Sequence, residues 1–125
     1  MPIEYPSALE LLEAAEEFLR KDVLDKLEGA QRYHLQVALN ALAIVARELA
    51  LGARLEAEES ARLAELVGPT GPACEANQVL CAKIRARELT WRDAKLMRHL
   101  FATALGKMSI DNPRYATYLR ATSPK

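Results

Sequence analysis

The nineteen residues from Tyr33 to Leu51, YHLQVALNALAIVARELAL, constrain the fold of this chain more than any other segment. Apolar side chains recur on nearly every side of a helix drawn through them, so this helix must be covered all round by its own domain or by a partner. Four polar side chains inserted into it, His34, Asn40, Arg47 and Glu48, must then be satisfied within that cover. We therefore predict a buried central helix.

The composition favours an all-α fold. Half of the 125 residues are apolar but only 6% are aromatic, so the core must consist mainly of Leu, Ala, Val and Ile, as in packed helices. No segment alternates polar and apolar residues as a half-buried strand does. The length suits one domain. We expect a single helical bundle over residues 1–120 and a disordered tail over 121–125.

The first helix is predicted from a capping box of Ser7 and Glu10 and ends near Leu27, before a glycine. One side carries Leu11, Leu12, Ala15, Phe18, Leu19 and Val23. The opposite side is charged, and two i,i+4 pairs, Glu16–Arg20 and Glu17–Lys21, are expected to cross it in solvent.

Local signals place the remaining helices and their ends. The central helix is expected over 30–51 with Gly52 at its C′ position, and a third helix over 55–67. The segment Gly68-Pro69-Thr70-Gly71-Pro72 breaks the chain, and Pro72 suits the first turn of a fourth helix over 72–87. Thr90 and Asp93 repeat the cap pattern and begin a fifth helix, which Asn112-Pro113 ends. Asn112 could cap a short C-terminal helical turn through Tyr115, Tyr118 and Leu119. The pattern predicts about five helices.

The last two long helices each carry an expected core stripe. In the fourth helix, Asn77, Leu80, Cys81 and Ile84 share a side, and Cys74 and Cys81 are expected to be buried thiols, about 10 Å apart and too distant for a disulfide. In the fifth, the stripe is Leu96, Met97, Leu100, Phe101, Ala104, Leu105 and Met108. Lys95, His99, Ala102, Thr103 and Gly106 lie opposite or beside it. Their small members permit close approach by another helix or by a ligand.

Charge is unevenly distributed along a chain of zero net charge. Residues 1–82 carry a net charge of −7 and residues 83–125 a net charge of +7. Either acidic and basic helices face each other, or a basic surface awaits phosphate or an acidic partner. Nucleic acid is not expected, because aromatic residues do not interleave with the basic ones. No uninterrupted apolar run approaches the ~18 residues of a membrane span, and the acidic N-terminus is unlike a secretory signal, so we expect a cytoplasmic protein.

The end of the fifth helix concentrates polar groups. Turn chemistry accounts for Asp111 and Asn112, whereas Arg114 and Tyr115 are large side chains suited to anchoring an interface. No phosphate-binding glycine loop, hydrolase motif or metal-ligand spacing occurs, so we expect neither self-contained catalysis nor a cofactor or metal.

Three segments carry a resemblance to a known family: PSALELLEAAEEFL, YHLQVALNALAIVARELALG and ALGKMSIDNPRYA. They occur in order with compatible spacing, and together the chain resembles a family of small bacterial helical proteins described as a domain of unknown function. Members of that family are typically encoded beside an aminoglycoside-phosphotransferase-like kinase and an acyl-CoA dehydrogenase. The resemblance implies a non-catalytic accessory subunit of a kinase that acts on hydroxyacyl-CoA intermediates in hydroxy-acid catabolism.

On this hypothesis the polar residues of the matched segments, Arg47, Glu48, Asp111, Asn112, Arg114 and Tyr115, form the partner-facing surface or a polar network beneath it. Lys107 or Arg114 could contact phosphate groups of a coenzyme A thioester. A second hypothesis is a small-molecule-binding domain or weak enzyme with a pocket lined by His34, Asn40 and His99. A third is a homodimer that hides the apolar helices.

Overall fold

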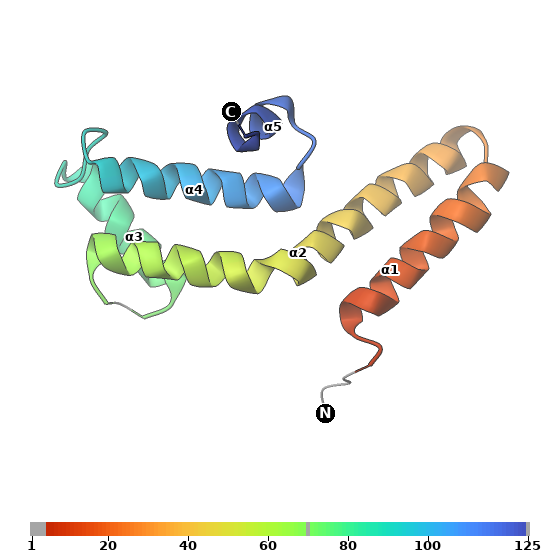
Figure 1. Cartoon of the computed structure of the whole chain (residues 1–125), viewed down its shortest axis with the longest axis horizontal. Helices are drawn as coiled ribbons and strands as arrows, with labels where there is room; N and C mark the ends of the chain where they lie inside the picture. Colours follow the sequence, from red (N-terminus) through yellow and green to blue (C-terminus); the bar gives the residue numbers. More distant parts are fainter. Residues whose placement is uncertain (1–4, 70, 125) are drawn as a thin grey trace. The chain divides into compact units, whose positions relative to one another are not determined.

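The structure is a computed structural model that describes residues 5–69 and 71–124 (Figure 1). Those residues form helices and no strand, which confirms the all-α prediction. In chain order the α-helices are α1 (Ala8–Phe18), α2 (Gly29–Val67), α3 (Ala73–Arg85), α4 (Ala94–Asp111) and α5 (Ala116–Thr122). Thr70, within the predicted chain break, and Lys125, the last residue of the predicted tail, lie outside the described residues.

The first helix begins as the sequence predicts. The Ser7 side chain accepts a hydrogen bond from the Glu10 backbone N–H, and the Glu10 carboxylate accepts one from the Ser7 backbone N–H. α1 then continues as a π-helical turn, η1 (Leu19–Val23), and a 3₁₀ turn, η2 (Leu24–Lys26). Leu27 follows with an extended backbone, so the predicted end near this residue is confirmed.

α2 is one continuous helix of 39 residues, and the predicted break at Gly52 is wrong. Gly52 lacks a positive φ angle, and a Cβ at this position would meet only the Glu48 side chain, at 3.6 Å. A glycine of this kind weakens a helix by about 1 kcal/mol relative to alanine but does not end it. The helix instead ends before Gly68, whose φ of 82° is the left-handed conformation of a C′ glycine.

The described chain divides into two compact units. Unit 1 holds residues 5–52 and 110–112, and unit 2 holds residues 53–69, 71–109 and 113–124. α2 therefore contributes its first part to unit 1 and its second part to unit 2.

In unit 1, α1 runs beside the first part of α2 (Figure 1). Between Tyr33 and Leu51 only Leu39 is buried, so the prediction of a buried central helix is wrong for the chain as a single copy. The physical reason is the number of helices, because one neighbouring helix can cover only one side of α2. The buried residue of α1 is Glu16, which contradicts the predicted solvent-exposed Glu16–Arg20 pair. The Glu17–Lys21 pair is confirmed, with 2.6 Å between the ammonium nitrogen and a carboxylate oxygen.

Unit 2 contains the hydrophobic core of the chain. Its buried members come from three helices and are Leu63, Ala76, Leu80 and Leu96, with Leu66, Val67 and Leu89 packed against them. Because α3 buries Ala76 and Leu80, its inward side lies away from the cysteines. Cys74 and Cys81 are both exposed, so the prediction of buried thiols is wrong.

α4 packs with a different side from the one its apolar pattern predicts. Leu96 and His99 are its buried residues, whereas Met97, Leu100 and Phe101 are exposed. Gly106 lies on the packed side, where a Cβ would make an ordinary van der Waals contact with the Leu55 side chain of α2, at 3.5 Å. Another helix, α2, therefore packs against the side of α4 that carries the small residues, through Leu55 and Arg62.

The C-terminal helical turn also exists, but its cap differs from the prediction. Tyr115, not Asn112, is the N-cap residue of α5, and its side chain makes no capping hydrogen bond. The helix includes residues 121 and 122.

Candidate functional site

The most distinctive surface of the chain is an exposed apolar side of α2 within unit 1. Side chains four residues apart form a row along it, and its larger members are Tyr33 (63% exposed), Val37 (51%), Val45 (45%) and Leu49 (51%). Ala41, at the middle of the row, is exposed as well. Leu39, two residues from Ala41, points about 160° away from it and is 3% exposed. The side of α2 opposite its one buried contact is therefore apolar and uncovered.

Two of the predicted polar residues lie on this same exposed side. His34 and Glu48 are exposed, and each is seven residues from Ala41. At this spacing the three side chains lie nearly in line along the helix. The His34 ring also packs edge-on against Tyr33, with 5.7 Å between the ring centroids. Asn40 is exposed on a different side of the helix, about 120° from His34.

Among residues 5–69 and 71–124, α2 is the one helix long and apolar enough to cross a membrane. This finding rests on length and composition, and the sequence argument from uninterrupted apolar runs did not detect it. Core helices of soluble proteins pass the same test, but here only 6% of the apolar window is buried. The uncovered surface is thus the property that any function of unit 1 has to explain.

Within the described part of unit 1, Arg47 is the predicted site residue that makes a long-range polar contact. Its guanidinium Nε donates a hydrogen bond of 2.6 Å to the backbone carbonyl of Ile110, near the end of α4. The last carbonyls of a helix lack partners within the helix and carry its partial negative charge, so a guanidinium stabilises them well. Arg47 is half-buried, and this contact assigns it to a structural polar network rather than to a free surface.

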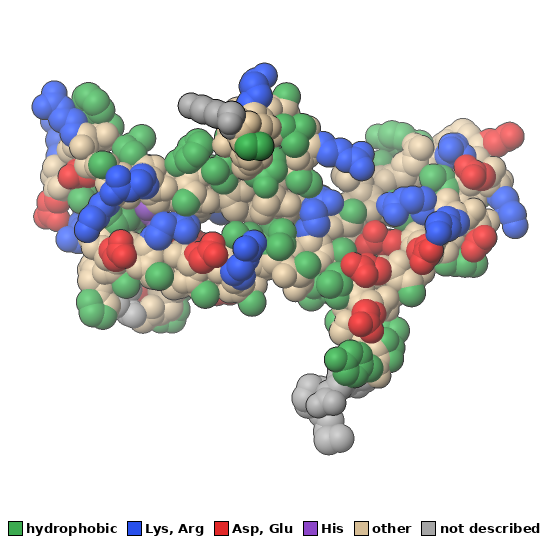
Figure 2. All heavy atoms as spheres, in the orientation of Figure 1, with side chains coloured by type: hydrophobic (Ala, Val, Ile, Leu, Met, Phe, Trp, Pro, Cys, Tyr) green, Lys and Arg blue, Asp and Glu red, His purple; other side chains and the backbone are tan. Residues whose placement is uncertain are grey.

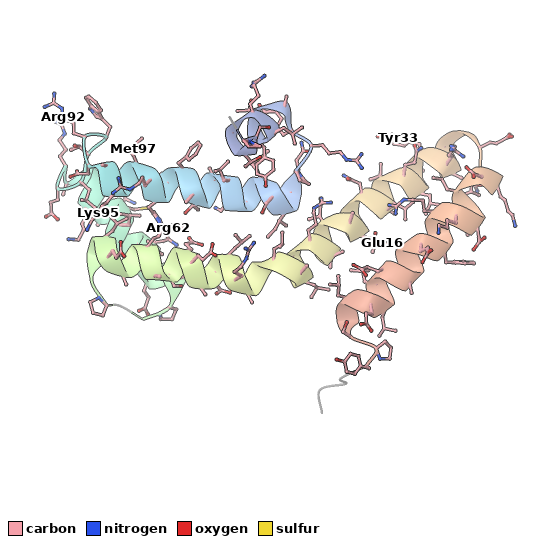
Figure 3. All side chains as sticks on the ribbon, viewed as in Figure 1. Glu16, Tyr33, Arg62, Arg92, Lys95 and Met97 are labelled. Carbon is pink, nitrogen blue, oxygen red and sulfur yellow. The ribbon has the colours of Figure 1, made fainter. Side chains whose placement is uncertain are left out.

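A second polar network, partly buried, lies in unit 2. The Arg62 guanidinium of α2 donates to Nδ1 of His99 at 3.2 Å and to the Thr103 hydroxyl at 3.3 Å, both on α4. Figure 3 shows Arg62 between the two helices. His99 is 3% exposed, and its Nδ1 lone pair is occupied by the Arg62 N–H, so the ring cannot use that nitrogen to take a proton from Thr103. This network joins α2 to α4 and does not form a nucleophile–base pair.

Burial lowers the pKa of His99 below its ordinary value of 6.5, and the neighbouring Arg62 charge lowers it further, whereas Glu59 opposes both. The folded state therefore resists protonation of a ring that the unfolded chain protonates readily. We expect the free energy of unfolding to fall as the pH drops below about 6.5 and to lose this dependence above that value. Urea denaturation at about pH 8 and about pH 5.5 measures the difference.

His99→Gln is the control for this prediction, because its amide oxygen can still accept from Arg62 but cannot titrate. The variant is expected to lose less stability than the wild-type chain on acidification. Equal losses in the two proteins would show that His99 does not contribute to the pH dependence.

The outer side of α4 is a second uncovered apolar surface. Met97 (44% exposed), Leu100 (42%) and Phe101 (59%) are neighbours on this helix, and Ala104 beside them is exposed. Figure 2 shows hydrophobic side chains reaching the surface along α4, and Figure 3 labels Met97 among them. An exposed cluster of this kind marks an interaction site when it is contiguous.

The remaining predicted site residues lie at the C-terminal end of the chain and are solvent-exposed. They are Lys107, Asp111, Asn112, Arg114 and Tyr115. Tyr115 is 51% exposed, and Leu119, one turn later in α5, is 49% exposed. Asp111 and Asn112 belong to unit 1, whereas Lys107, Arg114 and Tyr115 belong to unit 2.

The charge asymmetry leaves basic groups at the surface. The three ion pairs found in the described part of the chain, Lys21–Glu17, Arg32–Asp25 and Lys83–Glu88, each join residues close in sequence. None of them links residues 1–82 to residues 83–125. In the loop before α4, the Arg92 guanidinium carbon lies 5.2 Å from the Trp91 ring centroid, and Trp91 is 74% exposed.

The proposed pocket residues are distributed over both units. His34 and Asn40 lie on α2 in unit 1, and His99 is buried in unit 2. The described residues contain no group of three or more His, Cys, Asp or Glu side chains that could hold a metal ion.

Two polar residues, the buried Glu16 and the half-buried Arg62, were not identified from the sequence. Glu16 is 8% exposed, and its Oε1 has no hydrogen-bond partner. Both lie in helices whose neighbouring residues are charged, and nothing in the local pattern separates them from solvated residues. Arg62 is recognised only through its partners on α4, 37 and 41 residues away in sequence.

Comparison with known families gives one match. The family model described as Domain of unknown function (DUF6285) matches residues 25–115, which include all of α2, α3 and α4. The chain belongs to this family. No curated protein and no solved structure matches the chain. The matched residues therefore include both polar networks and the exposed sides of α2 and α4. The family description assigns no activity to any of these residues.

Proposed function

We propose that this chain is a non-catalytic accessory subunit or scaffold of an aminoglycoside-phosphotransferase-like kinase that acts on hydroxyacyl-CoA intermediates in hydroxy-acid catabolism. The kinase, the acyl-CoA pathway and the bacterial origin come from the resemblance of the three matched segments, and the cytoplasmic location comes from the acidic N-terminus and the interrupted apolar runs of the sequence. What supports a binding role is the amount of apolar surface that the folded chain leaves uncovered.

The observation that carries the proposal is the outer side of α4. Met97, Leu100 and Phe101 are 42–59% exposed on a helix whose other side is fixed to α2 by the Arg62 network. A rigid helix with an exposed aromatic residue suits the centre of a protein interface, since aromatic side chains bury much area for little conformational entropy. We assign this surface to the kinase.

Basic residues near this surface would assist the association. Lys95 and Arg98 are exposed on α4, and the exposed Arg92 lies in the loop before it (Figure 3). Arg114 and Tyr115 are further exposed candidates in unit 2. Cations at the rim of an apolar interface mainly raise the association rate and select acidic partners.

Co-expression of the chain with the kinase, followed by purification on a tag carried by the kinase, tests the proposal. We expect the chain to remain bound, and the kinase to phosphorylate hydroxyacyl-CoA faster in the complex than alone. Phe101→Glu is expected to abolish co-purification, because it places a carboxylate in the centre of the apolar surface.

Leu11→Glu is the matched control. Leu11 is 55% exposed on α1, close to the 59% of Phe101, but it lies in unit 1. This variant should still bind the kinase. A kinase that is equally active alone and forms no stable complex would exclude the accessory role, and a complex that survives Phe101→Glu would exclude α4 as its site.

A further inference from the structure

We infer that two copies of the chain associate through the exposed side of α2, antiparallel and about a two-fold axis at Ala41. This interface lies in unit 1, away in sequence from the α4 surface assigned to the kinase, so the two proposals can fail separately. The inference starts from the order of residues along the exposed side.

The exposed side is self-complementary about Ala41. Seven residues before it lies His34 and seven residues after it lies Glu48, both exposed and nearly in line with it. Apolar residues are placed symmetrically as well, with Val37 and Val45 four residues on either side and Tyr33 and Leu49 eight residues on either side. A two-fold interface requires this property, since one patch must fit a second copy of itself.

Antiparallel packing brings unlike polar groups together. With Ala41 at the axis, His34 of each copy lies opposite Glu48 of the other, and the imidazole N–H can donate to the carboxylate. The same contact forms twice, once at each end of a stretch about 21 Å long. Parallel packing would instead place Glu48 opposite Glu48, and two facing carboxylates repel each other.

His34 and Glu48 also argue against a lipid membrane as the partner that covers the exposed side of α2. Glu48 lies within the apolar side, where hydrocarbon would offer its carboxylate no partner. A second copy offers His34. The charge pattern therefore selects a second copy over a membrane, although α2 has the length and hydropathy of a spanning helix.

Ala41 permits close approach at the axis. Packed helices lie about 8–10 Å apart and their Cα atoms lie about 2.3 Å from each helix axis, so facing Cα atoms come within roughly 3.5–5.5 Å. A large residue here would separate the helices, whereas the methyl group of alanine does not. This distance range overlaps that of a disulfide, about 4.4–6.8 Å between Cα atoms, which makes the axis testable.

Cysteine cross-linking tests the axis in a full-length chain in which the exposed Cys74 and Cys81 are replaced by serine. Ala41→Cys is expected to form a covalent dimer under mild oxidation. Gln36→Cys, an exposed position on another side of α2, is the matched control and should stay monomeric under denaturing electrophoresis. If Ala41→Cys cross-links no better than Gln36→Cys, the axis is excluded.

Two further variants test the direction of packing. His34→Cys and Glu48→Cys should each fail to cross-link alone, because in the antiparallel dimer the two copies of either residue are far apart. A mixture of the two variants should form the heterodimer. Self-cross-linking of His34→Cys would show parallel packing and overturn the inference.

Light scattering on the unmodified chain completes the test. The expected mass is twice 13.9 kDa, and Glu48→Lys should shift it toward the monomer. Combining His34→Glu with Glu48→Lys exchanges the two polar partners and should restore the dimer. A monomeric wild-type chain, or a double variant no better than Glu48→Lys alone, would contradict the predicted pairing.

Discussion

Leu63→Ala is expected to lower the free energy of unfolding of unit 2 by about 3 kcal/mol, within the range of 2–5 kcal/mol for buried leucines. Leu63 is 1% exposed and is the largest fully buried side chain in the described chain. It lies in α2 and packs in the cluster that also contains residues of α3 and α4, so its removal leaves a cavity where three helices meet.

Leu100→Ala is the matched control for this prediction. It makes the same chemical change in a helix of the same unit, but Leu100 is 42% exposed, so we expect a loss below about 1 kcal/mol. Urea denaturation followed by circular dichroism gives the total effect, and amide hydrogen exchange in α3 and α4 assigns it to unit 2. Equal losses in the two variants would show that Leu63 is not a core residue.

Glu16→Met is expected to raise the free energy of unfolding by about 1–3 kcal/mol. Glu16 lies on α1 (labelled in Figure 3), is 8% exposed, and its Oε1 has no hydrogen-bond partner. A carboxylate oxygen removed from water without a partner costs stability, whereas a methionine of similar length fills the same space with apolar atoms. Glu and Met have similar helix propensities, so the backbone contributes little to the difference.

Glu13→Met, an exposed position on the same helix, is the control and should change stability little. Thermal and urea denaturation of both variants measure the effect. A loss of stability in Glu16→Met would show that a cationic or hydrogen-bonding group satisfies the Glu16 carboxylate in solution.

The sequence was sufficient for the fold class and for features set by neighbouring residues. The capping box of Ser7 and Glu10 formed as predicted. The Thr90 backbone N–H donates to the Asp93 carboxylate at 2.7 Å, but the helix begins at Ala94 and not at Thr90 as predicted. These contacts depend on residues three apart, so the chain itself fixes their geometry.

Features that depend on distant partners could not be predicted. The apolar pattern of α4 indicated Met97, Leu100 and Phe101 as core, but packing selected the adjacent side with His99 and Gly106. A helical pattern shows that a side is apolar without showing which neighbour covers it. The exposure of α2 has the same origin, because an apolar helix requires cover that another molecule can supply.

Of the candidate site, Arg47 was predicted to need a polar partner and has one, whereas His99 was predicted only as a pocket residue and also has a polar partner. The partners themselves, the Ile110 carbonyl and Arg62, lie 63 and 37 residues away in sequence. Only the packing of helices brings such pairs together, and no spacing rule encodes it.

The unbroken helix α2 has a consequence for dissecting this protein. Extending an existing helix adds a hydrogen bond for each residue fixed, whereas starting a new one carries a large entropic cost. Each unit uses part of the same 39-residue helix, so a helix begun in one can grow into the other. Fragments cut at Gly52 would each have to nucleate anew, and neither half is expected to be recoverable as a stably folded truncation.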